Sequence, residues 1–291
     1  MSSSLIGIAY MCLGVLCLAL GDALAKWLGE SYAPVQIIFF RTLVALPLIM
    51  LIAYLNGGLR TLATRRPGVH LMRGLIATGT MFCFIMGLTL LPLAETTAIA
   101  FAAPLFVTLL SGPLLSERVE RLPFIASLIG FAGVLIVVRP GAAGFQLGAL
   151  VVVGAAVCYA LLMVTARRYG GKERLWAMVF YVTLVPLIVS ALLLPLFWRP
   201  PQSVHWLGFI AAGVLGVVAM TCITLAFRHA PASLAAPFDY TAMVWAVLLG
   251  WWFWGEMPDL WVYVGTGVII GSGVLIAVHE RKVAIKARPS T

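Results

Sequence analysis

Charged residues are scarce in this 291-residue chain: Asp, Glu, Lys and Arg together make up 10% of it, whereas 63% of the residues are apolar. A helix in a water-soluble protein presents a polar face to solvent, and long stretches of this chain have none. An α-helix of about 20 apolar residues crosses the hydrocarbon core of a bilayer. The composition therefore excludes a soluble globular fold and predicts membrane spans within the charge-free stretches 1–21, 42–59, 140–166, 175–198, 200–227 and 260–278.

Catalytic and metal-binding motifs are also missing. The sequence has no H-E-x-x-H, G-x-S-x-G or phosphate-binding P-loop pattern. Its five cysteines all fall in apolar stretches, without the spacing of zinc ligands. We therefore expect no enzymatic activity, no cofactor and no metal. The net charge of +9 is interpreted as a membrane-orientation signal with some affinity for anionic lipid, and not as a nucleic-acid surface.

Proline, glycine and charged residues divide the apolar sequence into ten predicted helices. With the N-terminus in the cytoplasm, most Lys and Arg residues fall in cytoplasmic loops, as is typical of membrane proteins; the exceptions are Lys26, Arg139 and Arg199 outside and Arg41 within a span. We therefore predict that both termini are cytoplasmic, and the composition favours a bacterial inner membrane. The predicted spans are 5–25, 34–55, 70–90, 92–115, 121–139, 145–167, 175–197, 204–228, 231–254 and 258–279.

The two halves of the chain resemble each other, since residues 7–28 align with residues 148–169 without a gap. Matching pairs include Lys26 with Arg167, Pro92 with Pro231, and Glu117 with Glu256. Five helices per half is an odd number, so the second half enters the membrane from the opposite side. Inverted repeats of this kind are common in transporters that work by alternating access, although a duplicated static channel or scaffold is an alternative.

The predicted fold is therefore an all-α integral membrane protein, with ten transmembrane helices arranged as two inverted five-helix repeats around a central cavity. The first repeat covers residues 1–143, the second covers residues 144–280, and a basic cytoplasmic tail covers residues 281–291.

Particular segments resemble the EamA-type branch of the drug/metabolite transporter superfamily. The run LPLAETTAIAFAAPLFVTLLSGPLLSERV (91–119) followed by IGFAGVLIVVRPG (129–141) is similar to that family, as are GDALAKWL (21–28) and FFRTLVALPL (39–48). The resemblance implies ten helices, cytoplasmic termini and a central cavity. It also implies transport, mostly export of small metabolites including amino acids, although relatives that carry riboflavin, S-adenosylmethionine or phosphorylated sugars also exist.

Asp239 is the deepest acid in the predicted spans. It follows Pro231 by eight residues, which places it roughly 12 Å from the inner end of its helix. A charge at this depth is costly and is usually functional. We interpret Asp239 as a binding site for a substrate amine or a proton, with Phe238, Tyr240 and Trp245 as an aromatic wall. The alternatives are a structural partner for Arg41 or a carboxylate that packs between helices.

Three further charged residues lie within or near the spans. Arg41 is either structural, paired with an acid such as Asp22, or holds a substrate carboxylate. Asp22 and Lys26 are four residues apart and are expected to pair on one helix face. Glu95 suits the first turn of a helix. Asp22, Glu95 and Asp239 are the candidates for ion coupling.

Aromatic and hydroxyl residues of several spans are expected to line the cavity as a mostly apolar small-molecule site. These candidates are Phe84, Thr97, Phe101, Tyr159 and Thr224. Gly267 and Gly271 form a G-x-x-x-G pattern that predicts close helix packing within or between monomers.

The leading hypothesis is an exporter of amino acids or similar amphipathic solutes that works by alternating access. One alternative is uptake or exchange of a larger metabolite, such as riboflavin, S-adenosylmethionine or a phosphorylated or nucleotide-linked solute. A phosphorylated or nucleotide-linked solute would require more basic residues deep in the spans than Arg41. Another is a membrane scaffold without transport. The expected partners are a small-molecule substrate and the lipid bilayer, and the monomer and the dimer both stay open.

Overall fold

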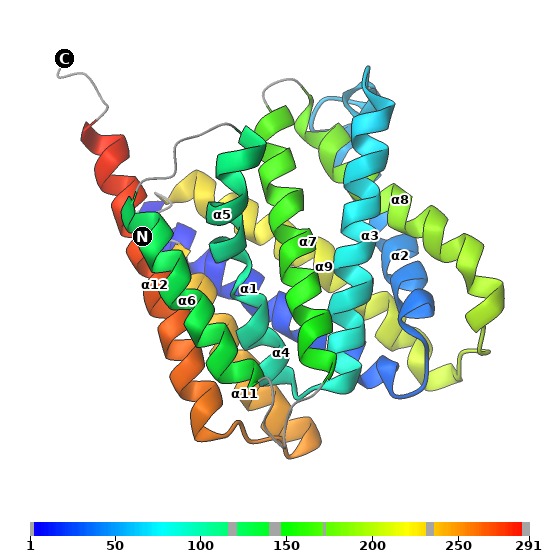
Figure 1. Ribbon diagram of the computed structural model, residues 1–291. Coiled ribbons are helices and arrows are strands. Elements are labelled where there is room, and N and C mark those ends of the chain that lie inside the picture. Colours follow the sequence, from blue (N-terminus) through cyan, green and yellow to red (C-terminus); the bar gives the residue numbers. More distant parts are fainter. Residues whose placement is uncertain (1–2, 116–120, 140–146, 171–172, 231–235, 287–291) are drawn as a thin grey trace.

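The computed structural model describes residues 3–115, 121–139, 147–170, 173–230 and 236–286, and in this part of the chain every regular element is a helix (Figure 1). The helices of the first repeat are α1 (Ser3–Gly29), α2 (Pro34–Leu55), α3 (Pro67–Leu90), α4 (Leu93–Ala100), α5 (Ala103–Leu115) and α6 (Arg121–Val138), with a short 3-10 helix η1 (Leu59–Leu62). Those of the second are α7 (Leu147–Gly170), α8 (Leu175–Phe197), α9 (Ser203–His229), η2 (Ala236–Tyr240), α11 (Thr241–Trp254) and α12 (Leu260–Lys286).

These elements confirm the predicted all-α membrane fold. Among the described residues, seven helices are long and apolar enough to cross a membrane, with α4 and α5 counted together as one, and parts of α6 and α12 are shorter apolar helices. The ninth predicted span contains η2 and α11. The predicted boundary between the repeats, at residues 143 and 144, lies outside the described residues.

Two spans are interrupted at equivalent positions of the two repeats. In the fourth span the helix stops at Ala100 and resumes at Ala103, where Pro104 has no N–H to donate to the preceding turn. In the ninth span, η2 ends at Tyr240 and gives way to α11. Irregular backbone at membrane depth is tolerated where protein or a water-filled cavity surrounds it. The two interruptions therefore mark the interior of the bundle.

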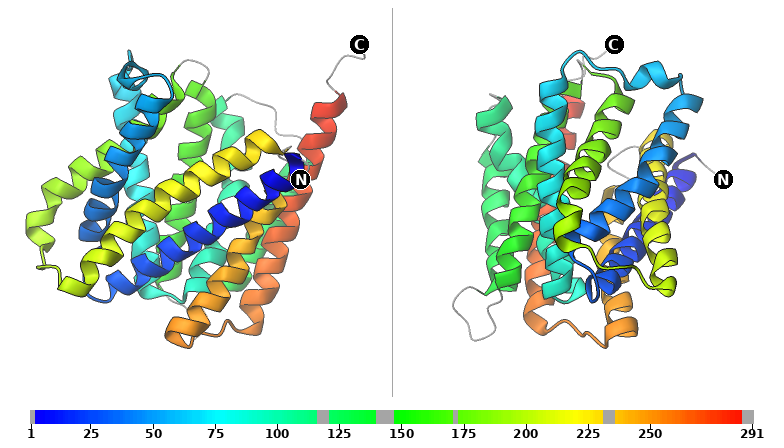
Figure 2. Two further views of the ribbon diagram at one scale, coloured as in Figure 1. Left: turned by 180° about the vertical axis from the view of Figure 1, so that it is seen from behind. Right: turned by 90° about the vertical axis from the view of Figure 1, so that its right-hand side faces the viewer.

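The third helix of each repeat packs against the first two helices of the other repeat. Helix α9 lies along α1, and α3 lies along α7 in the same manner (Figure 2). Missing side chains permit these close contacts: a Cβ on Gly14 would lie 2.9 Å from Ile223, and a Cβ on Gly87 would collide with Val152. Likewise α9 packs on α2 and α3 packs on α8. We call these two interleaved groups of helices bodies: one consists of α1, α2 and α9, and the other of α3, α7 and α8. Helix α2 also packs on α8, which joins the two bodies.

A polar contact fixes each body at one membrane surface. At the side predicted from the loop charges to be the outer one, the hydroxyl of Tyr32 is 2.7 Å from Nδ1 of His205, at the start of α9. At the opposite, predicted inner side, Glu173 lies 3.1 Å from Nε2 of His70, near the start of α3, and accepts a hydrogen bond from Thr64 at 2.9 Å. These two hydrogen bonds hold the pKa of the Glu173 carboxyl below its usual value.

We predict a pH-dependent stability difference for Glu173→Gln. Because the folded-state pKa lies below the ordinary value of 4.5, the carboxylate stabilises the fold above that pH and loses its effect as the pH falls through the lowered pKa. Thermal unfolding in detergent should show the variant less stable than the parent at neutral pH, with the gap closing in acid. A gap that does not change with pH would contradict this account.

The contact between α6 and α12 uses other glycines than the G-x-x-x-G pattern predicted for packing within or between monomers. Helices α6 and α12 run side by side at one end of the molecule (Figure 1). The close approach occurs at Gly133 and Gly265, where a Cβ on Gly265 would lie 2.7 Å from the carbonyl oxygen of Gly133. No described atom lies within 4 Å of a Cβ on Gly267 or Gly271. The G-x-x-x-G pattern therefore makes no close contact within the described part of the chain.

We predict opposite outcomes for two leucine substitutions in α12. Gly265→Leu forces a side chain into the Gly133 backbone, which cannot rotate away, and should cost about 2 kcal/mol or more. Gly267→Leu is the matched control, since it has the same change in helix propensity and open space. Thermal unfolding in detergent should show a lowered Tm for Gly265→Leu alone.

Candidate functional site

The interrupted spans meet at an aromatic pair. Phe101 follows Pro92 by nine residues, and Tyr240 follows Pro231 by the same interval; their ring centroids are 5.3 Å apart. The tyrosine hydroxyl lies against α12 at Gly273, where a Cβ would collide with it. Phe101 and Tyr240 therefore join the two repeats at their interruptions.

Asp239 lies beside this pair in η2, and its side chain is exposed. Its negative charge is close enough to act on the phenol groups of Tyr240 and Tyr159. Tyr159 belongs to α7 and is 45% exposed. Among the described residues, no salt bridge reaches Asp239. An accessible acid without a basic partner is thus flanked by phenol groups from η2 and α7.

Four other predicted cavity residues have packing or hydrogen-bond partners elsewhere in the bundle. Phe238 and Trp245 pack against the buried cluster of Met11, Val15, Ala226 and Ala230 between α1 and α9. Phe84 packs against the core of α1, α2 and α3. Thr224 is exposed on α9, and its hydroxyl donates to the carbonyl of Met220 at 2.7 Å.

Arg41 lies between α2 and α9. Its Nη2 is 3.5 Å from the position of a Cβ on Gly216, so the missing side chain provides the space for the guanidinium. Its positive charge is close enough to Asp22 on α1 to stabilise that carboxylate. Within the described part of the chain no salt bridge joins Arg41 to Asp22, so the structural and the substrate-binding roles of Arg41 both stay predictions.

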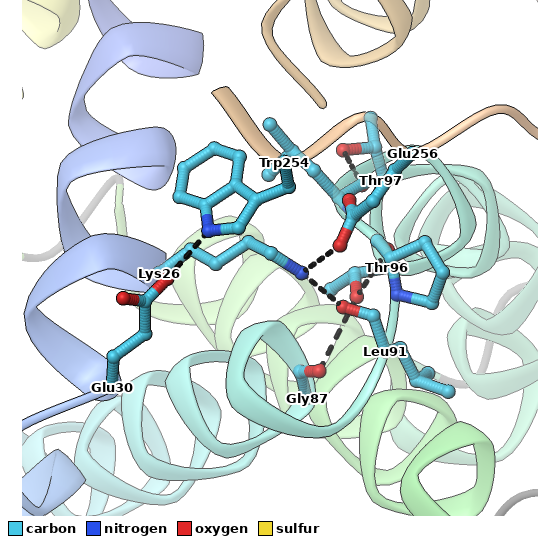
Figure 3. Close-up of polar contacts among 10 residues, drawn as sticks. Lys26, Glu30, Gly87, Leu91, Thr96, Thr97, Trp254 and Glu256 are labelled. Atoms are coloured by element: carbon cyan, nitrogen blue, oxygen red, sulfur yellow. Dashed lines mark hydrogen bonds and ion pairs between the residues drawn. The ribbon is translucent and has the colours of Figure 1, made fainter. Parts of the chain in front are cut away.

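A second polar group, the outer cluster, consists of Lys26, Glu30, Trp254 and Glu256 (Figure 3), together with Glu95, whose carboxyl is within electrostatic range of Lys26 and Glu256. Lys26 is 8% exposed. Its Nζ lies 2.7 Å from Oε1 of Glu256 and donates a hydrogen bond of 2.7 Å to the carbonyl of Leu91. The other carboxylate oxygen of Glu256 accepts a hydrogen bond from the amide of Leu93 at 2.9 Å. Lys26 and Glu256 therefore join α1, the α3–α4 turn and the end of α11.

Local sequence explains the position of Glu256. Gly255 ends α11 with φ of 65°, a left-handed conformation that favours glycine. The amide of Glu256 then donates to the carbonyl of Gly250 at 3.1 Å, and the side chain turns toward the first residue of α4. A carboxylate at a helix N-terminus interacts favourably with the helix dipole, which adds to its pairing with Lys26.

The remaining members surround this ion pair. Trp254 Nε1 donates to Oε1 of Glu30 at 2.6 Å, and Nζ of Lys26 lies 5.5 Å from the indole centroid (Figure 3). Glu95, in the first turn of α4 as predicted, is within electrostatic range of Lys26 and Glu256. Beside the cluster, the Arg139 guanidinium pairs with Asp259 and holds the pKa of that carboxyl below its usual range.

Beneath the outer cluster lies a small cavity of about 20 Å³, enough for roughly one water molecule. Asp22 and Thr97 line it, together with Leu18, Ala19, Leu93, Ala242 and Ala246. The Thr97 hydroxyl donates to the carbonyl of Leu93 at 2.9 Å. Within the described part of the chain, no hydrogen bond or salt bridge reaches the Asp22 carboxylate.

The predicted pairing of Asp22 with Lys26 is wrong for this structure, because Lys26 pairs with Glu256 instead. The sequence carries one signal for the observed pair, since Glu256 follows a helix-ending glycine at the same membrane side as Lys26. Its repeat counterpart Glu117 lies outside the described residues. No group of His, Cys, Asp and Glu side chains in the described ranges is arranged to hold a metal ion.

We predict that Gly273→Ala destabilises the protein and that Tyr240→Phe relieves the effect. The added methyl group collides with the tyrosine hydroxyl, whereas the ring carbon beneath that hydroxyl is 3.7 Å away, an ordinary contact distance. The double variant should therefore be as stable as Tyr240→Phe alone, as measured by thermal unfolding. Additive losses would show that the alanine acts elsewhere.

Comparisons with known proteins give the same architecture. The model of the EamA-like transporter family matches residues 5–139 and again residues 146–278. The S-adenosylmethionine uptake transporter of Rickettsia conorii is 29% identical over 96% of this chain and 94% of its own. The riboflavin transporter of Vibrio cholerae is 31% identical over 89% of this chain and 90% of its own.

The pseudopaline exporter of Pseudomonas aeruginosa is 30% identical over 88% of each chain. A solved crystal structure of 24% identity matches with a TM-score of 0.63, covering 94% of this chain and 98% of its own, which shows a shared fold.

Proposed function

Because the chain belongs to the EamA-like transporter family, we propose that it carries a small amphipathic metabolite with a positively charged group, such as an amino acid, out of the cell by alternating access. The proposed route crosses a bacterial inner membrane, with both termini in the cytoplasm and the two predicted repeats forming the path.

The unpaired acid at Asp239 carries this proposal. It lies next to a helix interruption, at the place where transporters with broken helices hold their substrates. An accessible carboxylate without a basic partner attracts an amine or a sulfonium group, and aromatic faces add a cation–π attraction. We assign charge recognition to Asp239 and contacts with the body of the solute to Tyr159, Tyr240 and Phe101.

The charge distribution opposes an anionic substrate. Arg41 is the one base well inside a predicted span, and its charge acts on Asp22; Arg73 is buried near the start of α3, close to the end of its span. A phosphorylated or nucleotide-linked solute would need several bases near Asp239. Arg41 therefore serves best as a structural partner of Asp22, and Thr97, Phe84, Thr224, Phe238 and Trp245 shape the path around the solute.

Uptake of a larger cationic metabolite is the second candidate. S-adenosylmethionine is an amino acid that carries a sulfonium group, so the Asp239 site would suit it too. The relatives named for its uptake match along 94–96% of their length. Measurement of flux in both directions separates this candidate from export.

We further propose that access alternates when the two interleaved bodies tilt against each other. Each body keeps its polar contact at one surface, Tyr32 with His205 or Glu173 with His70, while the interface between the bodies opens on one side at a time. Asp239, Asp22 and Glu95 are the acids placed to carry a coupling proton; comparison of flux with and without a pH gradient tests this role.

We predict that Asp239→Asn removes selectivity for cationic solutes. Proteoliposomes would be tested with amino acids, S-adenosylmethionine, riboflavin and a sugar phosphate, in both directions. A hydrogen bond to a charged group contributes about 1.5–3 kcal/mol, so kcat/KM for a cationic solute should fall roughly tenfold to hundredfold. Asp259→Asn, which removes an acid at the surface, is the matched control. Preferred transport of the sugar phosphate, or unchanged flux in Asp239→Asn, would contradict the proposal.

A further inference from the structure

Lys26 is a buried cation whose acidic partner belongs to a different segment. Its helix, α1, packs on α9 in one of the two bodies. Its partners are the carboxylate of Glu256, after α11, and the carbonyl of Leu91, before α4. Any movement that separates α1 from α4 and α11 at the outer side must break both contacts and leave the ammonium group without a partner.

Asp22 is a second acid within reach of Lys26. The two residues are four apart on α1, a spacing that brings Cβ atoms within roughly 6 Å of each other. Asp22 has no hydrogen bond or salt bridge among the described residues and borders the cavity beneath the outer cluster. The facing wall of that cavity contains Leu93 of α4 and Ala246 of α11. Separation of these helices from α1 would widen this cavity beside Asp22.

We propose that Lys26 is an outer gate residue with two alternative acidic partners. It binds Glu256 and the Leu91 carbonyl when the outer side is closed, and it binds Asp22 when the outer side opens. The proposal rests on the proposed transport function and deepens it by naming the residues that set the balance between closed and open states.

Two alternative partners lower the free energy of opening. A buried cation without a partner is strongly destabilised by desolvation, so a gate with one acid would remain closed. Asp22 lowers the free energy of the open state by accepting the freed ammonium group. In the closed state, the positive charge of Arg41 acts on Asp22. In the open state, Glu256 loses its cation, but it keeps the hydrogen bond from the amide of Leu93 and gains access to water from the outer side.

Two other acids lie near Lys26, and their positions make them poorer second partners. Glu95 belongs to α4 and moves away with the Leu91 carbonyl. Glu30 is four residues beyond Lys26, but it lies past the end of α1 and is exposed, where an ion pair contributes little. Glu30 therefore provides a matched control for Asp22, at the same sequence distance from the lysine.

The experiment measures access to the cavity from the outer side. A single cysteine replaces Ala246 in a background without the five native cysteines, and its reaction rate with a membrane-impermeant thiol reagent is followed in intact cells. Ala246 is 2% exposed in this closed arrangement, so reaction requires opening. A second reporter, Leu18→Cys, covers the case in which the first impairs folding, and monodisperse elution in detergent confirms folded protein.

Glu256→Gln should raise the reaction rate roughly tenfold, and Asp22→Asn should lower it by a similar factor, because each removes the partner of one state. Glu30→Gln should leave the rate unchanged. In a Lys26→Met background, neither Glu256→Gln nor Asp22→Asn should have a further effect. Where Glu256→Gln does not fold, Glu256→Asp replaces it, with a smaller rise.

Two results would overturn the proposal. One is that Asp22→Asn lowers the cysteine reaction rate equally with and without Lys26; the other is that Glu30→Gln lowers this rate as much as Asp22→Asn does. The readout does not require a known substrate. If the gate proposal is wrong, solute flux through the Asp239 site is still observed. If the proposed transport function is wrong, no solute is transported, while the cysteine reaction rate still responds to Glu256→Gln.

Discussion

The fold of this protein depends on one constraint: within the bilayer, where water is absent, every backbone N–H and C=O group needs a hydrogen-bond partner in the protein. Within a bilayer, only continuous helices meet that need on their own, and the long spans of the chain do so. The exceptions, at Phe101 and at η2, lie where the two repeats face each other. Because the interruptions bring irregular backbone, aromatic rings and Asp239 to one place, the same constraint that fixes the fold also positions the candidate binding site.

Close packing at glycine joins helices of the two repeats. Gly14 on α1 and Gly87 on α3 allow each third helix to lie against the first helix of the other repeat. The sequence repeats and the packed bodies are therefore different units: each body contains helices from both repeats. This interleaving means that a tilt of one body against the other acts on both interrupted spans at once, and it ties the outer cluster to the central site through α1, α4 and α11.

The sequence predicted the helices well because lipid imposes one simple pattern, apolar runs bounded by proline, glycine and charge. It also placed Asp239 and Tyr240 correctly as neighbours, since they adjoin in the chain. It did not predict that Lys26 pairs with Glu256, because this contact depends on the angle at which Gly255 ends α11. It did not show which helix face of α12 is covered within the monomer, where Gly265 and not Gly267 or Gly271 makes the close contact; packing of Gly267 and Gly271 between monomers stays a prediction.

The central claim is that Asp239 selects a solute by its positive charge. The most direct measurement compares an amino acid with its N-acetyl derivative, in which a neutral amide replaces the ammonium group, by the thermal shift each gives to the purified protein in detergent. The account predicts that the free amine raises Tm while the acetylated form does not, and that Asp239→Asn abolishes the difference. Equal shifts for the two ligands would contradict it.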